Sequence, residues 1–86
     1  MASYNVSLVP SARKELRHLP KPDLARTHEK ITNLAHNPRP HGVEKLAGSE
    51  DVYRLRQGDY RIIYHVNDST HQLTILRVRH RREAYR

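Results

Sequence analysis

The second half of the chain sets the strongest limit on the fold, because it contains three short segments that alternate between apolar and polar residues. The segments are residues 52–57, 60–66 and 73–79, and the turn residues Gly58-Asp59 and Asn67-Asp68-Ser69 lie between them. Alternation with a period of two is typical of strands with one buried face. Connections this short join antiparallel neighbours. The pattern predicts an antiparallel meander.

The first half predicts one more strand and two helices. Residues 4–9 alternate as a strand that ends at Pro10, and Ser11 is the expected N-cap of a short helix. A second helix follows Pro20-Lys21-Pro22 and stops at the prolines of residues 37–40. The apolar faces of the helices consist of Ala12, Leu16, Leu19, Leu24, Ile31, Leu34 and Ala35. We expect one α+β domain over residues 1–86, with a four-stranded, mostly antiparallel sheet and a helix hairpin on one face.

Composition limits the chemistry as well as the core. The chain has 86 residues and lacks cysteine, phenylalanine and tryptophan. Disulfides, thiolate metal sites and cysteine nucleophiles are therefore excluded. No signal peptide and no long apolar run is present, so we expect a cytoplasmic protein without a membrane span.

Charge points to an anionic partner, because the formal net charge is +7 and its distribution is uneven. Lysine is absent from residues 51–86, where all eight cations are arginines. Arginine presents a planar fork that binds phosphate bidentately and stays charged when desolvated. These arginines are Arg54, Arg56, Arg61, Arg77, Arg79, Arg81, Arg82 and Arg86. The pattern favours nucleic acid or another polyanion, and the alternative is a charge balance that serves only solubility.

Strand alternation predicts that one sheet face collects these arginines. Leu76 and Val78, like the apolar residues of the two preceding strands, should cover the helices. The opposite face then holds Arg54, Arg56, Arg61, Arg77 and Arg79, with Arg81 just beyond. Like charges on neighbouring strands destabilise a sheet, so a bound anion is the favoured explanation. The alternative is pairing with Asp51, Asp59, Asp68 and Glu83, but four acids cannot neutralise eight cations.

The common catalytic motifs are missing. There is no P-loop, no glycine-rich dinucleotide turn and no HExxH, and the seven histidines lack metal-ligand spacing. We therefore expect neither a metal nor a cofactor. A set of arginine, histidine and tyrosine suits RNA cleavage, in which a 2′-hydroxyl attacks the adjacent phosphate while the protein orients the chain and neutralises charge.

Two side chains near the end of the chain are candidates for this chemistry. Histidine is the usual general acid or base near neutral pH, and the arginines on both sides of His80 should favour its neutral form, as a general base requires. The alternative is an ordinary exposed histidine. Tyr85 could stack on a base or bind a phosphate, and the alternative is a tyrosine that packs the chain end against the sheet.

Several motifs resemble the RelE branch of the RelE/ParE toxin superfamily over nearly the whole chain. They are Asn37-Pro38-Arg39-Pro40-His41-Gly42, Lys45-Leu46-Ala47-Gly48, Tyr53-Arg54-Leu55-Arg56, Gly58-Asp59-Tyr60-Arg61 and the terminal His80-Arg81-Arg82-Glu83-Ala84-Tyr85. The resemblance implies the toxin of a toxin–antitoxin pair, which enters the ribosomal A site, cleaves mRNA there without metal and stops translation. Its implied partners are a RelB-like antitoxin, mRNA on the ribosome and ribosomal RNA.

The resemblance also implies residue roles. Arg61 matches the arginine that stabilises the transition state, Arg81 a second arginine for charge stabilisation or leaving-group protonation, and Tyr85 the tyrosine that orients the substrate. Further RNA contacts are expected from Arg54, Arg56, Arg77, Arg79, Arg82 and Lys45.

Two departures from the family pattern matter. Arg54 and Arg56 stand where the best-known member has lysines, and arginine is a poor general base because its pKa exceeds about 12. His80 is our candidate for that role, with Arg56 retained for the catalytic site. Arg79 stands where relatives often carry glycine. The alternatives to an RNA-cleaving toxin are a ParE-like inhibitor of DNA gyrase and a non-catalytic module that binds RNA or a partner.

Overall fold

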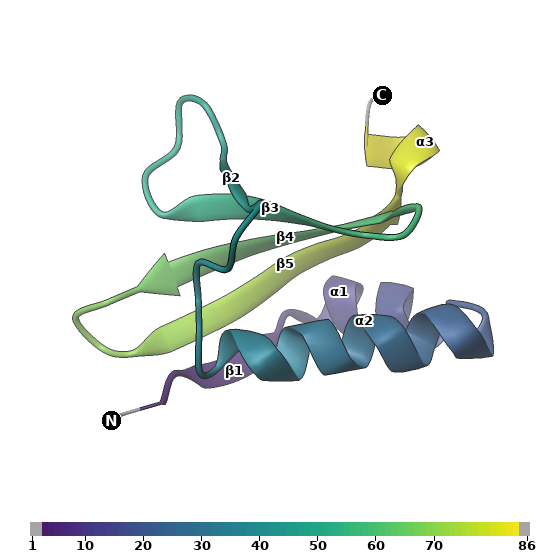
Figure 1. Cartoon of the computed structure of the whole chain (residues 1–86), viewed down its shortest axis with the longest axis horizontal. Coiled ribbons are helices and arrows are strands. Elements are labelled where there is room, and N and C mark those ends of the chain that lie inside the picture. Colours follow the sequence, from purple (N-terminus) through teal and green to yellow (C-terminus); the bar gives the residue numbers. More distant parts are fainter. Residues whose placement is uncertain (1–2, 85–86) are drawn as a thin grey trace.

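The computed structural model describes residues 3–84 and confirms the predicted order of one strand, two helices and a meander (Figure 1). It adds a two-residue strand and a short last helix. The elements are β1 (Asn5–Leu8), α1 (Pro10–Arg17), α2 (Lys21–Leu34), β2 (Glu44–Lys45), β3 (Val52–Gln57), β4 (Tyr60–Asn67), β5 (Gln72–His80) and α3 (Arg81–Ala84). The sheet therefore has five strands where four were expected.

The sheet has the strand order β1-β5-β4-β3-β2. The first strand pairs with β5 in parallel, and every other neighbouring pair is antiparallel. In Figure 1, α1 and α2 lie along one face, whereas α3 leaves the end of β5 on the other side. The face opposite α1 and α2 is therefore not covered by these two helices.

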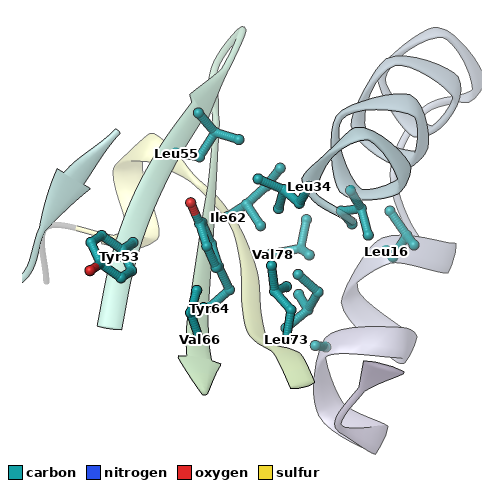
Figure 2. Packing of buried hydrophobic residues seen from close by; sticks show 12 residues of the cluster. Leu16, Leu34, Tyr53, Leu55, Ile62, Tyr64, Val66, Leu73 and Val78 are labelled. Carbon is teal, nitrogen blue, oxygen red and sulfur yellow. The ribbon is translucent and has the colours of Figure 1, made fainter. Parts of the chain in front are cut away.

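The core lies between the sheet and the two long helices. Leu16 and Leu34 face Ile62 and Val78 of the sheet (Figure 2). Each fully buried aliphatic side chain contributes roughly 1.5–3 kcal/mol to folding. Tyr64 is fully buried as well, and its hydroxyl donates to a loop carbonyl at 2.7 Å, that of residue 38. Burial raises the pKa of Tyr64, so this hydroxyl keeps the proton that it donates.

The expected N-cap at Ser11 is wrong. The first helix begins at Pro10, with Val9 in the cap position and no side-chain hydrogen bond to the first turn. Proline is favoured at the first helical position because its fixed φ suits the helix and its missing N–H has no partner to lose.

A β-bulge shifts the predicted alternation of the last strand. The register changes between Ile63 and Tyr64, which pair with Arg77 and Ile75, so Leu76 is the extra residue. In consequence Ile75 is fully buried, whereas Leu76, which we expected on the core face, is only half-buried.

The loop after α2 is fixed to the sheet by Arg39. Its Nη1 and Nη2 donate to Oδ1 and Oδ2 of Asp68 at 3.2 and 2.7 Å, and its Nε donates to the Tyr53 hydroxyl at 2.8 Å. Tyr4 donates a further hydrogen bond to Asp68. These hydrogen bonds, that from Arg39 above all, lower the pKa of Asp68 to about 2. Each donor group of this arginine thus has a partner within the protein.

No helix in the described part of the chain combines the length and apolar character needed to cross a membrane.

Candidate functional site

The open sheet face carries a row of arginines on three neighbouring strands. Arg56 on β3 is directly opposite Arg61 on β4, which is directly opposite Arg79 on β5. Directly opposite residues have Cβ atoms about 5 Å apart and share a face. Arg61, in the middle, is 5% exposed, whereas Arg56 is exposed. The Nη1 of Arg61 donates to the carbonyl of Tyr60 at 3.2 Å, which helps to fix the direction of the guanidinium.

A hollow of about 410 Å³ opens beside this row, where β2 no longer covers the edge of β3. Its lining consists of Lys30, His41, Gly42, Glu44, Arg54, Leu55, Arg56 and Arg61. Four of these residues are cations and only one is an acid. We call this feature the basic hollow, and Arg54, Arg56 and Arg61 the hollow arginines.

The single acid of the basic hollow is already engaged. Glu44 Oε2 lies 2.6 Å from Arg54 Nη2. This hydrogen bond, and then the charges of Arg54, Arg56 and Arg61, lower the pKa of Glu44. The carboxylate therefore holds Arg54 and stays ionised, and the cations of the basic hollow still outnumber it.

Arg77 and Arg79 do not join the hollow arginines. The Arg79 Nε lies 3.3 Å from Glu15 Oε2, and the Arg77 Nη1 lies 3.6 Å from the same oxygen. Glu15 belongs to α1, which packs beside the free edge of β5. The face that the sequence predicted to carry five arginines is therefore divided. We call Arg77 and Arg79 the edge arginines.

His80 lies away from the basic hollow. Its ring packs edge-on against Tyr60, with centroids 5.4 Å apart, and both rings line a second hollow of about 490 Å³. The other lining residues come from β5 and from α1 and the residues just after it, on the helix side of the sheet. The His80 Nδ1 accepts the backbone N–H of Arg82 at 3.3 Å. Strand alternation explains the separation, because residues 79 and 80 point to opposite faces.

The remaining predicted residues that the structure describes do not line the basic hollow. Arg81 is exposed on α3, where its backbone N–H donates to the carbonyl of Asp59 and its Nε lies 3.8 Å from Asp59 Oδ1. Arg82 is exposed on the same helix. Lys45 pairs with Tyr53, so the register places it on the opposite face from Arg54. Tyr85 lies outside the described residues.

Four charged or titratable residues of the basic hollow and the edge arginines' site were not foreseen. Lys30, His41 and Glu44 line the basic hollow, and Glu15 binds the edge arginines. The turn at Gly42 was a signal for His41, because turn residues beside a sheet edge often line a site. Nothing in the sequence marked Glu15, which is 64 positions from Arg79. Among residues 3–84, no cluster of three or more histidines and acids could hold a metal ion.

Comparison with known proteins identifies the family of this chain. Residues 6–85 match the family described as "ParE toxin of type II toxin-antitoxin system, parDE". Toxin RelE of Mycobacterium tuberculosis is 30% identical over 84 residues, covering 96% of this chain and 87% of that protein. Putative toxin RelE1 of Methanocaldococcus jannaschii is 33% identical over 86 residues, covering 96% of each chain.

Solved structures give the same result. The archaeal RelE–RelB complex from Pyrococcus horikoshii contains a chain that superposes with a TM-score of 0.83 at 37% identity, covering 92% of this chain and 96% of that one. The isolated Escherichia coli RelE toxin shares the fold at 24% identity, with a TM-score of 0.81. The chain belongs to the RelE/ParE superfamily, as a RelE-type toxin of a type II toxin–antitoxin pair.

Proposed function

We propose that this toxin is a ribosome-dependent endoribonuclease that cleaves mRNA in the A site and so stops translation. One observation carries the proposal. Arg56 and Arg61 are directly opposite each other and line one basic hollow with Arg54. Guanidinium groups arranged in this way suit a single phosphodiester, because each can donate two parallel hydrogen bonds to phosphate oxygens.

The proposed reaction needs no group beyond RNA and protein side chains. The 2′-oxygen of one nucleotide attacks the adjacent phosphorus, a new P–O2′ bond forms and the P–O5′ bond breaks. The products are a 2′,3′-cyclic phosphate and a 5′-hydroxyl. The 2′-hydroxyl proton goes to a base, and an acid gives a proton to the leaving 5′-oxygen. Arg61 and Arg56 stabilise the negative charge of the phosphorane, and burial strengthens the contribution of Arg61.

The proton carrier is a histidine in this proposal. Arginine holds its proton too tightly, and Glu44 is bound to Arg54. His80, the carrier expected from the sequence, lines the second hollow with Tyr60. His41 lines the basic hollow itself and stands next to Gly42 at an exposed turn. We therefore assign proton transfer to His41 ahead of His80, with Arg81 and Tyr85 orienting the RNA.

The proposed partners follow the relatives. Solved complexes pair RelE chains with RelB antitoxins in Mycobacterium tuberculosis and Pyrococcus horikoshii. We propose that a cognate RelB-like antitoxin binds this toxin. Its place of action is then the cytoplasm, where ribosomes carry mRNA.

Primer extension on mRNA in a purified translation system tests the proposal. Wild type should give new 5′ ends within the codon in the A site, and Arg61→Ala should give none above background. Arg13→Ala is the matched control, because Arg13 is exposed on α1 and lies outside both hollows. An mRNA with a 2′-deoxynucleotide at the cleavage position should resist wild type. Binding of RNA without any new 5′ end would contradict cleavage and favour a non-catalytic module.

A gyrase inhibitor is the second candidate, because the matching family carries the ParE name. It predicts loss of DNA supercoiling by purified gyrase when the toxin is added. Cleaved mRNA together with unchanged supercoiling would exclude it.

A further inference from the structure

One acidic side chain joins the first helix to the last strand. Glu15 lies beside Leu16, whose buried side chain faces the sheet, and the Glu15 side chain is 23% exposed. Its Oε1 accepts the backbone N–H of Val78 at 3.0 Å, and its Oε2 contacts both edge arginines. A single carboxylate thus binds a strand edge and two guanidinium groups at once.

The sheet topology explains why a side chain is needed there. The parallel partner β1 reaches only as far as Leu8, opposite Ile75, and the chain then turns into α1 at Pro10. Past that point the outer edge of β5 has no strand partner among the described residues. A partly buried N–H without an acceptor destabilises the folded protein. Glu15 supplies the missing acceptor at Val78.

The second oxygen of Glu15 acts on the arginine row. Arg79 is directly opposite Arg61, and two like charges so placed repel each other. The Arg79 Nε lies 3.3 Å from Glu15 Oε2, at the outer edge of β5 rather than in the basic hollow. Arg79 thus contacts Glu15, while Arg61 lines the basic hollow with Arg56, and α3, which carries Arg81, starts directly after β5.

We propose that Glu15 is a positioning residue for the Arg61 site, acting through Val78 and Arg79 without touching RNA. The inference rests on the proposed function, since it specifies what holds the catalytic geometry. It gives a distinct kinetic signature. Removing the charge lets Arg79 move toward Arg61, so kcat falls. The protein also loses a negative charge beside a cationic surface, so KM for mRNA stays equal or falls. Loss of an RNA-binding arginine would instead raise KM.

The test compares Glu15→Gln with Glu50→Gln, which removes the same charge from an exposed loop residue. Glutamine at position 15 still offers an oxygen to Val78, so the variant should fold with little change in Tm. We expect kcat in the purified translation system to fall about tenfold, since small displacements of positioned groups have effects of this size or larger. The Glu50 variant should match wild type. In the Arg79→Ala background, Glu15→Gln should cause no more than a twofold further loss.

The outcomes separate the inference from the proposed function. If folded Glu15→Gln retains wild-type kcat, the positioning role is wrong and the nuclease proposal stands. If wild type cleaves no mRNA, the nuclease proposal fails and the positioning role with it. Amide hydrogen exchange adds a readout that does not depend on activity. Glu15→Ala should speed exchange at Val78 by at least tenfold, and unchanged exchange there would overturn the inference.

Discussion

The arginines near the two ends of β4 lie in opposite electrostatic environments. At the end that leads to Asp68, Arg39 forms a bidentate pair with that carboxylate, binds the Tyr53 hydroxyl and lies 5.1 Å over the Tyr53 ring. At the other end, Arg61 faces Arg56 across the strands in a hollow with several cations and one acid. The balance of cations and carboxylates therefore distinguishes the two ends: one arginine meets one carboxylate at the Arg39 end, and several cations share one carboxylate in the basic hollow.

Net charge alone does not locate the binding site of this protein. Asp68 satisfies Arg39, and Glu15 engages both edge arginines. What remains concentrated is the charge of the basic hollow. A site for an anion is found where a fold brings cations together without supplying an equal number of carboxylates.

The largest expected effect contrasts the two ends directly. Arg61→Ala should lower the cleavage rate about 10³-fold, because it removes charge stabilisation from the phosphorane. Arg39→Ala should lower Tm but leave kcat per folded molecule within about threefold of wild type, since Arg39 is occupied by Asp68. Single-turnover cleavage and thermal unfolding measured on the same samples check both. Equal losses of rate for the two variants would remove the distinction between them.

The two histidines give the next prediction. His41→Ala should lower the cleavage rate about 10²-fold and remove the rise in rate with increasing pH that a general base produces. His80→Ala should keep that pH dependence, because its ring lies with Tyr60 in the other hollow. Rates measured between pH 5 and pH 9 check this. A normal profile in the His41 variant, with the rise lost in the His80 variant, would return the base to His80.

The salt dependence of RNA binding should also differ between the two ends, with a smaller effect than the cleavage rates. Arg56→Ala should reduce the slope of log affinity for RNA against log salt concentration by roughly one unit, as expected when one phosphate contact is lost. Arg39→Ala should leave the slope unchanged. Fluorescence anisotropy with a labelled single-stranded RNA at several salt concentrations measures both. A larger change of slope in the Arg39 variant would contradict the assignment of the two ends.

The smallest effect concerns acid stability at the Arg39 end. The pKa of Asp68 falls from its ordinary 3.8 to about 2 in the folded protein, so its contribution is complete above about pH 4 and is lost as pH falls toward 2. Wild type should therefore be more stable than Asp68→Asn at pH 6, and the difference should shrink between pH 4 and pH 2. Thermal unfolding against pH measures it. A gap that widens on acidification would mean that Asp68 is not held as a carboxylate.

Much of this fold was predictable because the alternation of apolar residues and the turn residues determine the strands locally. The strand over residues 52–57 and the turn at Gly58 follow from alternation and turn chemistry, and the structure places them as expected. The strand β2 was missed because two residues are too few to show a period. The bulge at Leu76 was missed because Ile75 and Leu76 are adjacent and both apolar, so alternation alone does not tell which of them is buried.

The candidate site was predictable only in part, for a related reason. Arg56 and Arg61 are joined by a tight turn, so their proximity follows from sequence. The partner of Arg79 is Glu15 on the first helix, and the partner of Arg39 is Asp68 just after β4. Neither pair can be predicted from spacing along the chain. His41 reaches the hollow through the loop after α2, which the Tyr64 hydroxyl holds at the carbonyl of residue 38, a contact between residues 26 positions apart. Long-range ion pairs therefore decided which arginines share a site.

A double-mutant cycle on Arg56 and Arg61 tests most directly whether guanidinium groups from two strands act on one phosphate. Single-turnover cleavage rates would be measured for wild type, both alanine variants and the double variant, with a second cycle on Arg39 and Arg61 for comparison. Groups that share one phosphate should couple, so the double loss should fall short of the product of the single losses by about tenfold, or ~1.4 kcal/mol, while the Arg39 cycle is multiplicative. A multiplicative result for Arg56 and Arg61 would show that the two arginines act at separate places.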